Sequence, residues 1–236
     1  MLRLSDLRPL ALGLALVTGS AAEASEASFD FYVAGIRVGM LTLGTEQSDG
    51  RYSATGRIDT AGVAGLLSFF FDGSAAGSLG RDGTVVPISY AASSKSLRAA
   101  RRTEIDWKDG APVRVSVEPP RSTAPDPAAQ GGTLDPVSAS FRLLRDAPSD
   151  AICDTSVDVF DGSRRSRLRL APPREAEGGL VCDGTYARLQ GEGHALSSRR
   201  EFPFRIVFRR NGDGIAQLER IEAPTSFGNA VIERRG

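Results

Sequence analysis

The feature that most constrains the fold of this chain is a repeated pairing of short alternating runs with Asp-Gly or Asn-Gly turns. Residues 103–108 alternate apolar and polar side chains, Asp109-Gly110 follows, and residues 111–118 alternate again. Alternation with period two places apolar side chains on one face of a strand, and an Asp-Gly pair favours a tight hairpin turn. The pattern therefore predicts an antiparallel β-hairpin over residues 103–118.

The same pattern recurs between residues 29 and 234. Further turn signals lie between alternating runs at Ala34-Gly35, Asp49-Gly50, Asp72-Gly73, Asp82-Gly83, Asp161-Gly162 and Asn211 to Gly214. We count about a dozen expected strands, a number typical of a barrel, a sandwich or a strongly curved sheet. The expected fold class is therefore mainly β and antiparallel.

One α-helix is expected after the N-terminal hairpins. Asp135 is a good N-cap and Pro136 fits the first helical position. Val137, Phe141 and Leu144 then recur at the spacing of one helix face. We expect this helix to continue to about residue 145 and to cover the apolar side of the sheet.

The hairpins and the helix are joined by a Pro/Gly-rich connection at about residues 119–134, which we expect to be exposed. This connection could separate two domains, or it could be a long loop inside one domain. We favour a single domain over residues 25–236, because the N-terminal hairpins alone would leave an open sheet edge.

Residues 1–24 are typical of a secretory signal peptide. Two arginines precede the eight-residue apolar run at residues 10–17, and Ala22-Glu23-Ala24 offers a small-x-small cleavage site. An uncleaved anchor or a buried helix is the alternative, but the run is much shorter than the ~20 residues that span a bilayer. We therefore expect export to the periplasm and a mature chain that begins near Ser25 and is not integral to the membrane.

The chain has two cysteines, Cys153 and Cys182. An even pair in an exported protein usually forms a disulfide. A zinc site would need further ligands at short spacing, and the single histidine is His194. We therefore predict a structural disulfide between the two cysteines.

Features of an enzyme or of a nucleic-acid binder are weak. The 29 basic residues balance the 29 acidic residues, which argues against binding to nucleic acid. We find no Gly-x-Ser-x-Gly elbow, phosphate-binding loop, dinucleotide fingerprint or metal-ligand cluster, and His194 lies in a glycine-rich segment. We expect a protein without catalytic residues, cofactor or metal, and a hydrolase without a recognisable motif stays as an alternative.

Three arginines alternate along one expected strand, namely Arg165, Arg167 and Arg169. On one face of a sheet they could bind the carboxylates or phosphates of anionic envelope polymers. The alternative, which we favour, is a face on which these arginines pair with acidic side chains of the neighbouring strands.

The apolar stretch at residues 61–71 is the candidate ligand-binding segment. Its large side chains cannot all face one side of a strand. They could belong to a strand buried on both faces, or they could form a lip over a concavity that holds a lipid. The candidate ligand-binding residues, with one from the expected helix, are Val63, Leu66, Leu67, Phe69, Phe71 and Phe141.

Four segments resemble an exported bacterial family catalogued as domain of unknown function 3108. They are Phe31–Gly39, the helix start at Gly132–Ser140, Val159–Arg165 and Pro224–Ile232. The resemblance spans about residues 28–235 and implies an antiparallel, strongly curved, spiral-like open sheet, similar in architecture to periplasmic lipoprotein carriers. Ser140 departs from the family pattern, which often has a large apolar residue at that position.

The motifs of this resemblance are structural, so it implies no catalytic residue. Together with the residue patterns it leads to one main functional hypothesis. We expect a non-enzymatic periplasmic protein of the cell envelope, a binding or chaperone-like module that holds a lipid, an acyl chain or a protein segment. The alternative partner is an anionic envelope polymer, and the sequence does not indicate the oligomeric state.

Overall fold

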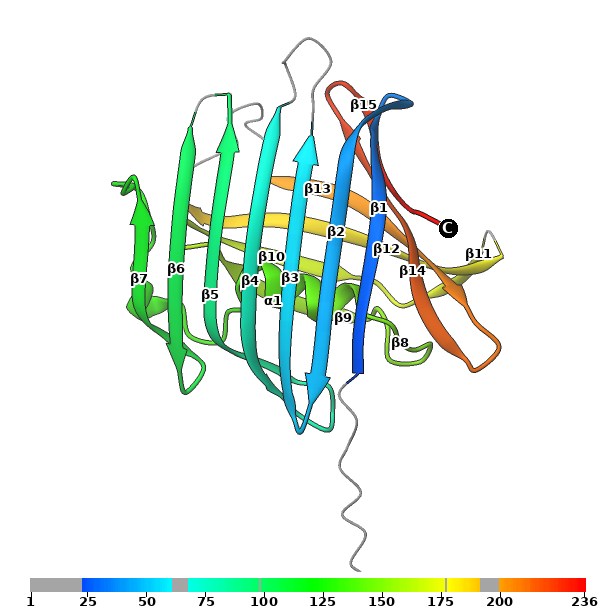
Figure 1. Cartoon of the computed structure of the whole chain (residues 1–236), viewed down its shortest axis with the longest axis horizontal. Coiled ribbons are helices and arrows are strands. Elements are labelled where there is room, and N and C mark those ends of the chain that lie inside the picture. Colours follow the sequence, from blue (N-terminus) through cyan, green and yellow to red (C-terminus); the bar gives the residue numbers. More distant parts are fainter. Residues whose placement is uncertain (1–22, 61–67, 98, 177, 192–199) are drawn as a thin grey trace, which may run out of the picture.

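The chain folds around one large antiparallel sheet (Figure 1). This computed structural model describes residues 23–60, 68–97, 99–176, 178–191 and 200–236. The strands of the first half are β1 (Glu23–Val33), β2 (Ile36–Ser48), β3 (Arg51–Thr60), β4 (Phe69–Leu79), β5 (Val85–Ser96), β6 (Ala100–Lys108) and β7 (Ala111–Glu118). A short 3-10 helix η2 (Pro127–Ala129) and the helix α1 (Pro136–Leu144) follow. The strands of the second half are β8 (Ala147–Pro148), β9 (Thr155–Phe160), β10 (Arg164–Leu170), β11 (Arg174–Ala176), β12 (Gly179–Gly191), β13 (Glu201–Arg210), β14 (Ile215–Thr225) and β15 (Gly228–Arg234).

The order of neighbouring strands shows how the sheet curves. It runs β7-β6-β5-β4-β3-β2-β1-β15-β14-β13-β12-β10-β9, so the two halves join where β1 pairs with β15. Figure 1 shows the second half crossing behind the first, with α1 between them. The path ends at β7 and β9, which do not pair with each other among the described residues. The expected curved, open, mainly β fold with one covering helix is therefore confirmed.

Helix α1 begins and ends as predicted. The Asp135 carboxylate accepts hydrogen bonds from the backbone N–H groups of Val137 (2.9 Å) and Ser138 (2.8 Å), which is the geometry of an N-cap. Arg145 is the C-cap residue. The helix packs on β3, β4 and β5. Among the helices of the described residues, none is long and apolar enough to cross a membrane.

Most of the expected turns are present, but the prediction of a turn at Asp72-Gly73 was wrong. Both residues lie inside β4, opposite Arg57 and Gly56 of β3. A Cβ added to Gly73 would lie 2.7 Å from the Phe71 ring and 3.2 Å from a methyl of Val137. Glycine is therefore used here for the close approach of helix to strand, which is a common role of glycine in a strand interior.

The connection at residues 119–134 differs from the expectation in its last part. Residues up to 129 are mostly exposed, whereas Gln130, Thr133 and Leu134 are buried. The backbone N–H of Leu134 donates to the Asp158 carbonyl (2.9 Å), and the Leu134 carbonyl accepts from Phe160 (2.8 Å). The segment leading into α1 is thus bound to β9, because a buried backbone needs hydrogen-bond partners.

The predicted disulfide is confirmed. Cys153 and Cys182 are bonded, with their Cα atoms 6.0 Å apart, and both residues are buried. The bond connects the segment that precedes β9 to the start of β12. It therefore cross-links two neighbouring parts of the second half of the sheet.

Candidate ligand cavity

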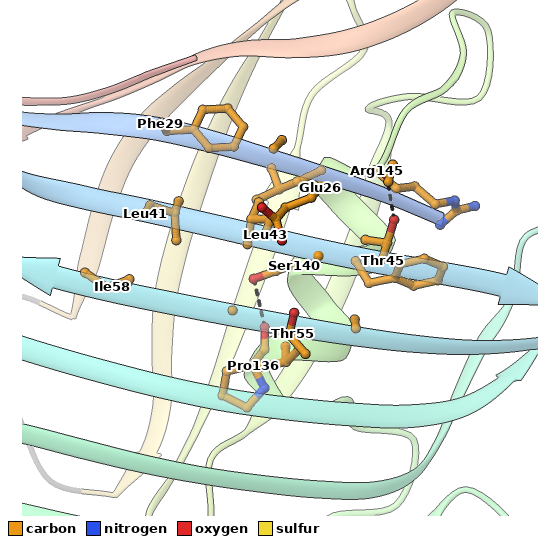
Figure 2. A pocket seen from close by; sticks show the side chains of 18 of the residues that line it. Glu26, Phe29, Leu41, Leu43, Thr45, Thr55, Ile58, Pro136, Ser140 and Arg145 are labelled. Carbon is orange, nitrogen blue, oxygen red and sulfur yellow. Dashed lines mark hydrogen bonds between the residues drawn. The ribbon is translucent and has the colours of Figure 1, made fainter. Parts of the chain in front are cut away.

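A row of large apolar side chains crosses the first four strands. The strand registers place Phe29 of β1 opposite Leu41 of β2, Leu41 opposite Ile58 of β3, and Ile58 opposite Phe71 of β4. Directly opposed residues of an antiparallel sheet project from the same face. Figure 2 shows Phe29, Leu41 and Ile58 lying side by side on neighbouring strands.

The next row of residues on this face is less bulky, because only one of its four members is larger than alanine. It consists of Ala27, Leu43, Gly56 and Gly73. Helix α1 lies over these small residues, because Val137 approaches both glycines closely. The large row beside the helix and the small row beneath it leave a cavity of about 330 Å³ between helix and sheet.

Three of the residues expected to bind a ligand line this cavity: Phe69, Phe71 and Phe141. Phe69 is 38% exposed, and Phe141 is buried on α1. Phe70 is not among the cavity residues, and the guanidinium of Arg57 lies 5.4 Å from the centroid of its ring. The consecutive phenylalanines of the apolar stretch therefore divide between the two faces of β4. Val63, Leu66 and Leu67 lie outside the described residues, as does His194.

A buried polar network fixes α1 against the sheet beside the cavity. The Tyr52 hydroxyl and Ser138 Oγ are 2.6 Å apart, and Ser138 Oγ also bonds to the Asp135 carboxylate. Burial raises the pKa of Asp135 from 3.8 to about 6 and also raises the pKa of Tyr52. None of these three side chains lines the cavity, so the network positions the helix and does not face a bound molecule.

One side of the cavity lies where the sheet divides. Residues Glu23–Ser28 of β1 pair with β2 alone, because the pairing of β1 with β15 begins at Phe29. The lining here is polar and consists of Ser25, Glu26, Arg145, Asp146, Gln217 and Arg234. Asp146 accepts from Gln217 (3.1 Å) and pairs with Arg234 (3.7 Å). We call these six polar residues the mouth of the cavity. The other lining residues are mostly apolar, with Thr45, Thr55 and Ser140 as further polar side chains. A mostly apolar lining with a few polar groups is usual in a small-molecule site.

The arginine face lies elsewhere, on β10. Arg165 and Arg167 both pair with Asp158 of β9, at 2.7 Å and 2.6 Å, whereas Arg169 is opposite Ser156 and exposed. The hydrogen bond from Arg167 and that from Arg165 lower the pKa of Asp158. Two of the three arginines thus pair with an acidic side chain of the neighbouring strand.

Reasoning from the sequence did not find most of the cavity. Phe29, Leu41 and Ile58 belong to alternating runs that indicated one apolar face, but not that the three side chains would be adjacent. Arg145 was expected only as the end of the helix. Across the described parts of the chain, His, Cys, Asp and Glu side chains do not gather in groups of three that could hold a metal ion.

The family described as "Protein of unknown function (DUF3108)" matches residues 28–177. The chain belongs to the DUF3108 family. This match spans α1 and the strands from β1 to β11, which include the apolar row and the helix that covers it. No curated protein and no solved structure matches the chain.

Proposed function

We propose that this DUF3108 protein is a non-enzymatic binding module of the periplasm that holds an acyl chain or a similar apolar group between its sheet and α1. The apolar stretch at residues 10–17 and the bonded cysteine pair support export to an oxidising compartment. The observation that carries the proposal is the mostly apolar cavity with polar residues at its mouth.

The size and lining of the cavity support binding of a small apolar molecule. Its volume is near the lower end of the roughly 300–1,000 Å³ of small-molecule pockets. Its interior is lined by side chains such as Leu43, Phe71 and Phe141. Burial of an alkyl chain against such side chains contributes about 0.8 kcal/mol for each CH₂ group removed from water.

The buried carboxylate beside the cavity supports a structural role rather than a catalytic one. The one buried carboxylate of the helix start, Asp135, is engaged by two backbone N–H groups and Ser138. General acid–base catalysis needs a titratable group within hydrogen-bond reach of the reacting atoms. Asp135 does not line the cavity, so it is a structural group in this proposal.

A variant that fills the cavity tests the proposal. Ser140 lines the cavity, and among the described residues its hydroxyl donates to the Pro136 carbonyl of the same helix (2.9 Å) and to no other group. Ser140→Phe should therefore occupy ligand space without removing a contact between helix and sheet. We expect the purified protein to bind the uncharged fluorophore N-phenylnaphthylamine with a rise in emission, and Ser140→Phe to bind it at least tenfold more weakly.

Ser140→Ala is the matched control, because it removes the same hydroxyl and adds no bulk. It should bind the fluorophore as the unmodified protein does. Thermal unfolding of each variant checks that the fold is retained. Absence of binding to the unmodified protein, or equal binding by a folded Ser140→Phe variant, would contradict the proposal.

A further inference from the structure

We propose that Arg145 binds the anionic head group of a single-chain amphiphile whose alkyl tail lies in the cavity. This inference rests on the proposed function, and it adds the chemical class of the ligand. The head group is a carboxylate or a phosphate, since both present oxygen atoms that match the planar guanidinium.

The charge on Arg145 supports this assignment. Among the described residues, no carboxylate lies within 4.0 Å of its guanidinium. The side chain is partly buried, its Nη1 donates a long hydrogen bond of 3.4 Å to the Arg142 carbonyl, and its guanidinium carbon lies 5.1 Å from the Phe141 ring centroid. Partial burial lowers the pKa of Arg145, and the nearby charge of Arg142 lowers it further. A charged group in such surroundings is stabilised by an anion.

Arg234, the other arginine of the mouth, is less able to pair with an anionic head group. It donates to the Leu218 carbonyl (2.7 Å), pairs with Asp146 (3.7 Å) and lies over the Phe29 ring. Its charge is therefore already compensated by the protein. Arg145 is the arginine of this mouth that an incoming anion can pair with.

The position of Arg145 relative to the apolar row also supports an amphiphile. Figure 2 shows Phe29, Leu41 and Ile58 at one end of the cavity and Arg145 at the other. The Nη2 atom of Arg145 lies beside Gly83, 3.2 Å from where a Cβ on that residue would be. Gly83 follows the end of β4, whereas Phe71 is near its beginning. A ligand with an apolar tail and a charged head therefore matches both ends of the site.

The volume of the cavity fits a ligand with one alkyl chain. A cavity of about 330 Å³ is at the small end of the range for ligand pockets, which favours one alkyl chain over the two chains of a diacyl lipid. Apolar side chains predominate in the lining, and its charged residues are Glu26, Arg145, Asp146 and Arg234. These features together specify a single-chain anionic amphiphile.

The test is displacement of N-phenylnaphthylamine from the purified protein by three molecules with the same tail. Dodecanoate and dodecyl phosphate carry the two candidate head groups, and dodecanol is the uncharged reference. We expect the better anion to compete roughly tenfold to a hundredfold more strongly than dodecanol, the ratio given by a hydrogen bond to a charged group. The ratio between the two anions distinguishes a carboxylate ligand from a phosphate ligand.

Arg145→Gln should bring the ratio of anion affinity to alcohol affinity close to one. Direct titration of the fluorophore into each variant gives the reference affinity for that ratio. Arg145→Lys should keep part of the preference for the anions over dodecanol, because lysine retains the positive charge but not the planar geometry of the guanidinium. The matched control is Arg142→Gln, since Arg142 lies in the same last turn of α1 and does not line the cavity. This control should retain the full preference.

The possible failures are distinguishable. Binding of the fluorophore with equal competition by all three molecules would overturn the role of Arg145 and leave the proposed binding function intact. Persistence of the anion preference in Arg145→Gln would also overturn the role of Arg145 and leave the proposed binding function intact. If the fluorophore does not bind to the unmodified protein, the proposed function and this inference both fail.

Discussion

Phe141 of α1 stacks face to face on Tyr52 of β3, with ring centroids 4.6 Å apart and ring planes 8° apart. The Tyr52 hydroxyl also bonds to Ser138, one turn earlier in the helix. These two contacts hold α1 over the small residues of the sheet. They therefore determine the position of one wall of the cavity.

This arrangement predicts unequal effects of two substitutions. Phe141→Ala removes a buried ring and should lower the free energy of unfolding by about 3–5 kcal/mol. Tyr52→Phe keeps the stacked ring and removes one hydrogen bond, so it should cost about 1 kcal/mol. Urea denaturation measures both values. Equal losses would show that the stacked pair does not anchor the helix.

Asp135 should make stability depend on pH. Its pKa in the folded protein is about 6, above the 3.8 of a free carboxyl group. Between these values the folded state holds a proton that the unfolded chain has lost, so stability from this group falls as pH rises from about 4 to about 6. The free energy of unfolding should fall by roughly 2–3 kcal/mol over this interval, and the contribution of Asp135 should not change further at higher pH.

Asp135→Asn isolates this effect, because the amide oxygen can still accept from the N–H groups of Val137 and Ser138 but the side chain does not ionise in this range. The difference in unfolding free energy, unmodified protein minus variant, should decrease between about pH 4 and about pH 6. An increase over that interval would show that the N-cap hydrogen bonds outweigh burial and lower the pKa of Asp135.

The disulfide should contribute to stability through the loop it closes. Cys153 and Cys182 are separated by 29 positions, so the loop-entropy relation gives about 3–4 kcal/mol. We expect the double variant Cys153→Ala and Cys182→Ala to unfold at a lower urea concentration by that amount of free energy. Labelling of the native protein by a thiol reagent before denaturation would contradict the bond.

Two glycines of neighbouring strands, Gly56 of β3 and Gly77 of β4, should respond differently to an added methyl group. At Gly77 of β4, a Cβ would overlap the Val86 carbonyl oxygen and the Tyr52 ring, so Gly77→Ala should destabilise by about 1–3 kcal/mol. At Gly56 of β3, a Cβ would make ordinary contacts of 3.8–3.9 Å. Gly56→Ala should therefore be neutral, or stabilising by up to about 1 kcal/mol. Similar losses of thermal stability in both variants would contradict the observed packing.

Local patterns predicted the parts of the fold that depend on neighbouring residues. The hairpin of β6 and β7 follows from alternation around Asp109-Gly110, and α1 follows from its N-cap and the spacing of Val137 and Phe141. The cysteine pairing followed from the number of cysteines and the expected compartment. These features need no knowledge of how distant strands align.

The cavity could not be predicted in the same way. The row from Phe29 to Phe71 exists only because three successive strand registers align, and a shift of one residue would send a side chain to the other face. The same long-range packing explains Asp72-Gly73, where contact with α1 rather than turn formation determines the need for glycine. The role of Arg145 likewise depends on where the helix ends relative to the mouth.

Native mass spectrometry tests the central claim most directly. The complete chain would be expressed in a Gram-negative host, purified from the periplasm and sprayed under non-denaturing conditions, followed by extraction and identification of any bound molecule. We predict an added mass that is extracted as a single-chain amphiphile and is absent from the folded Ser140→Phe variant. A bare protein mass that stays unchanged after incubation with dodecanoate or dodecyl phosphate would contradict the account.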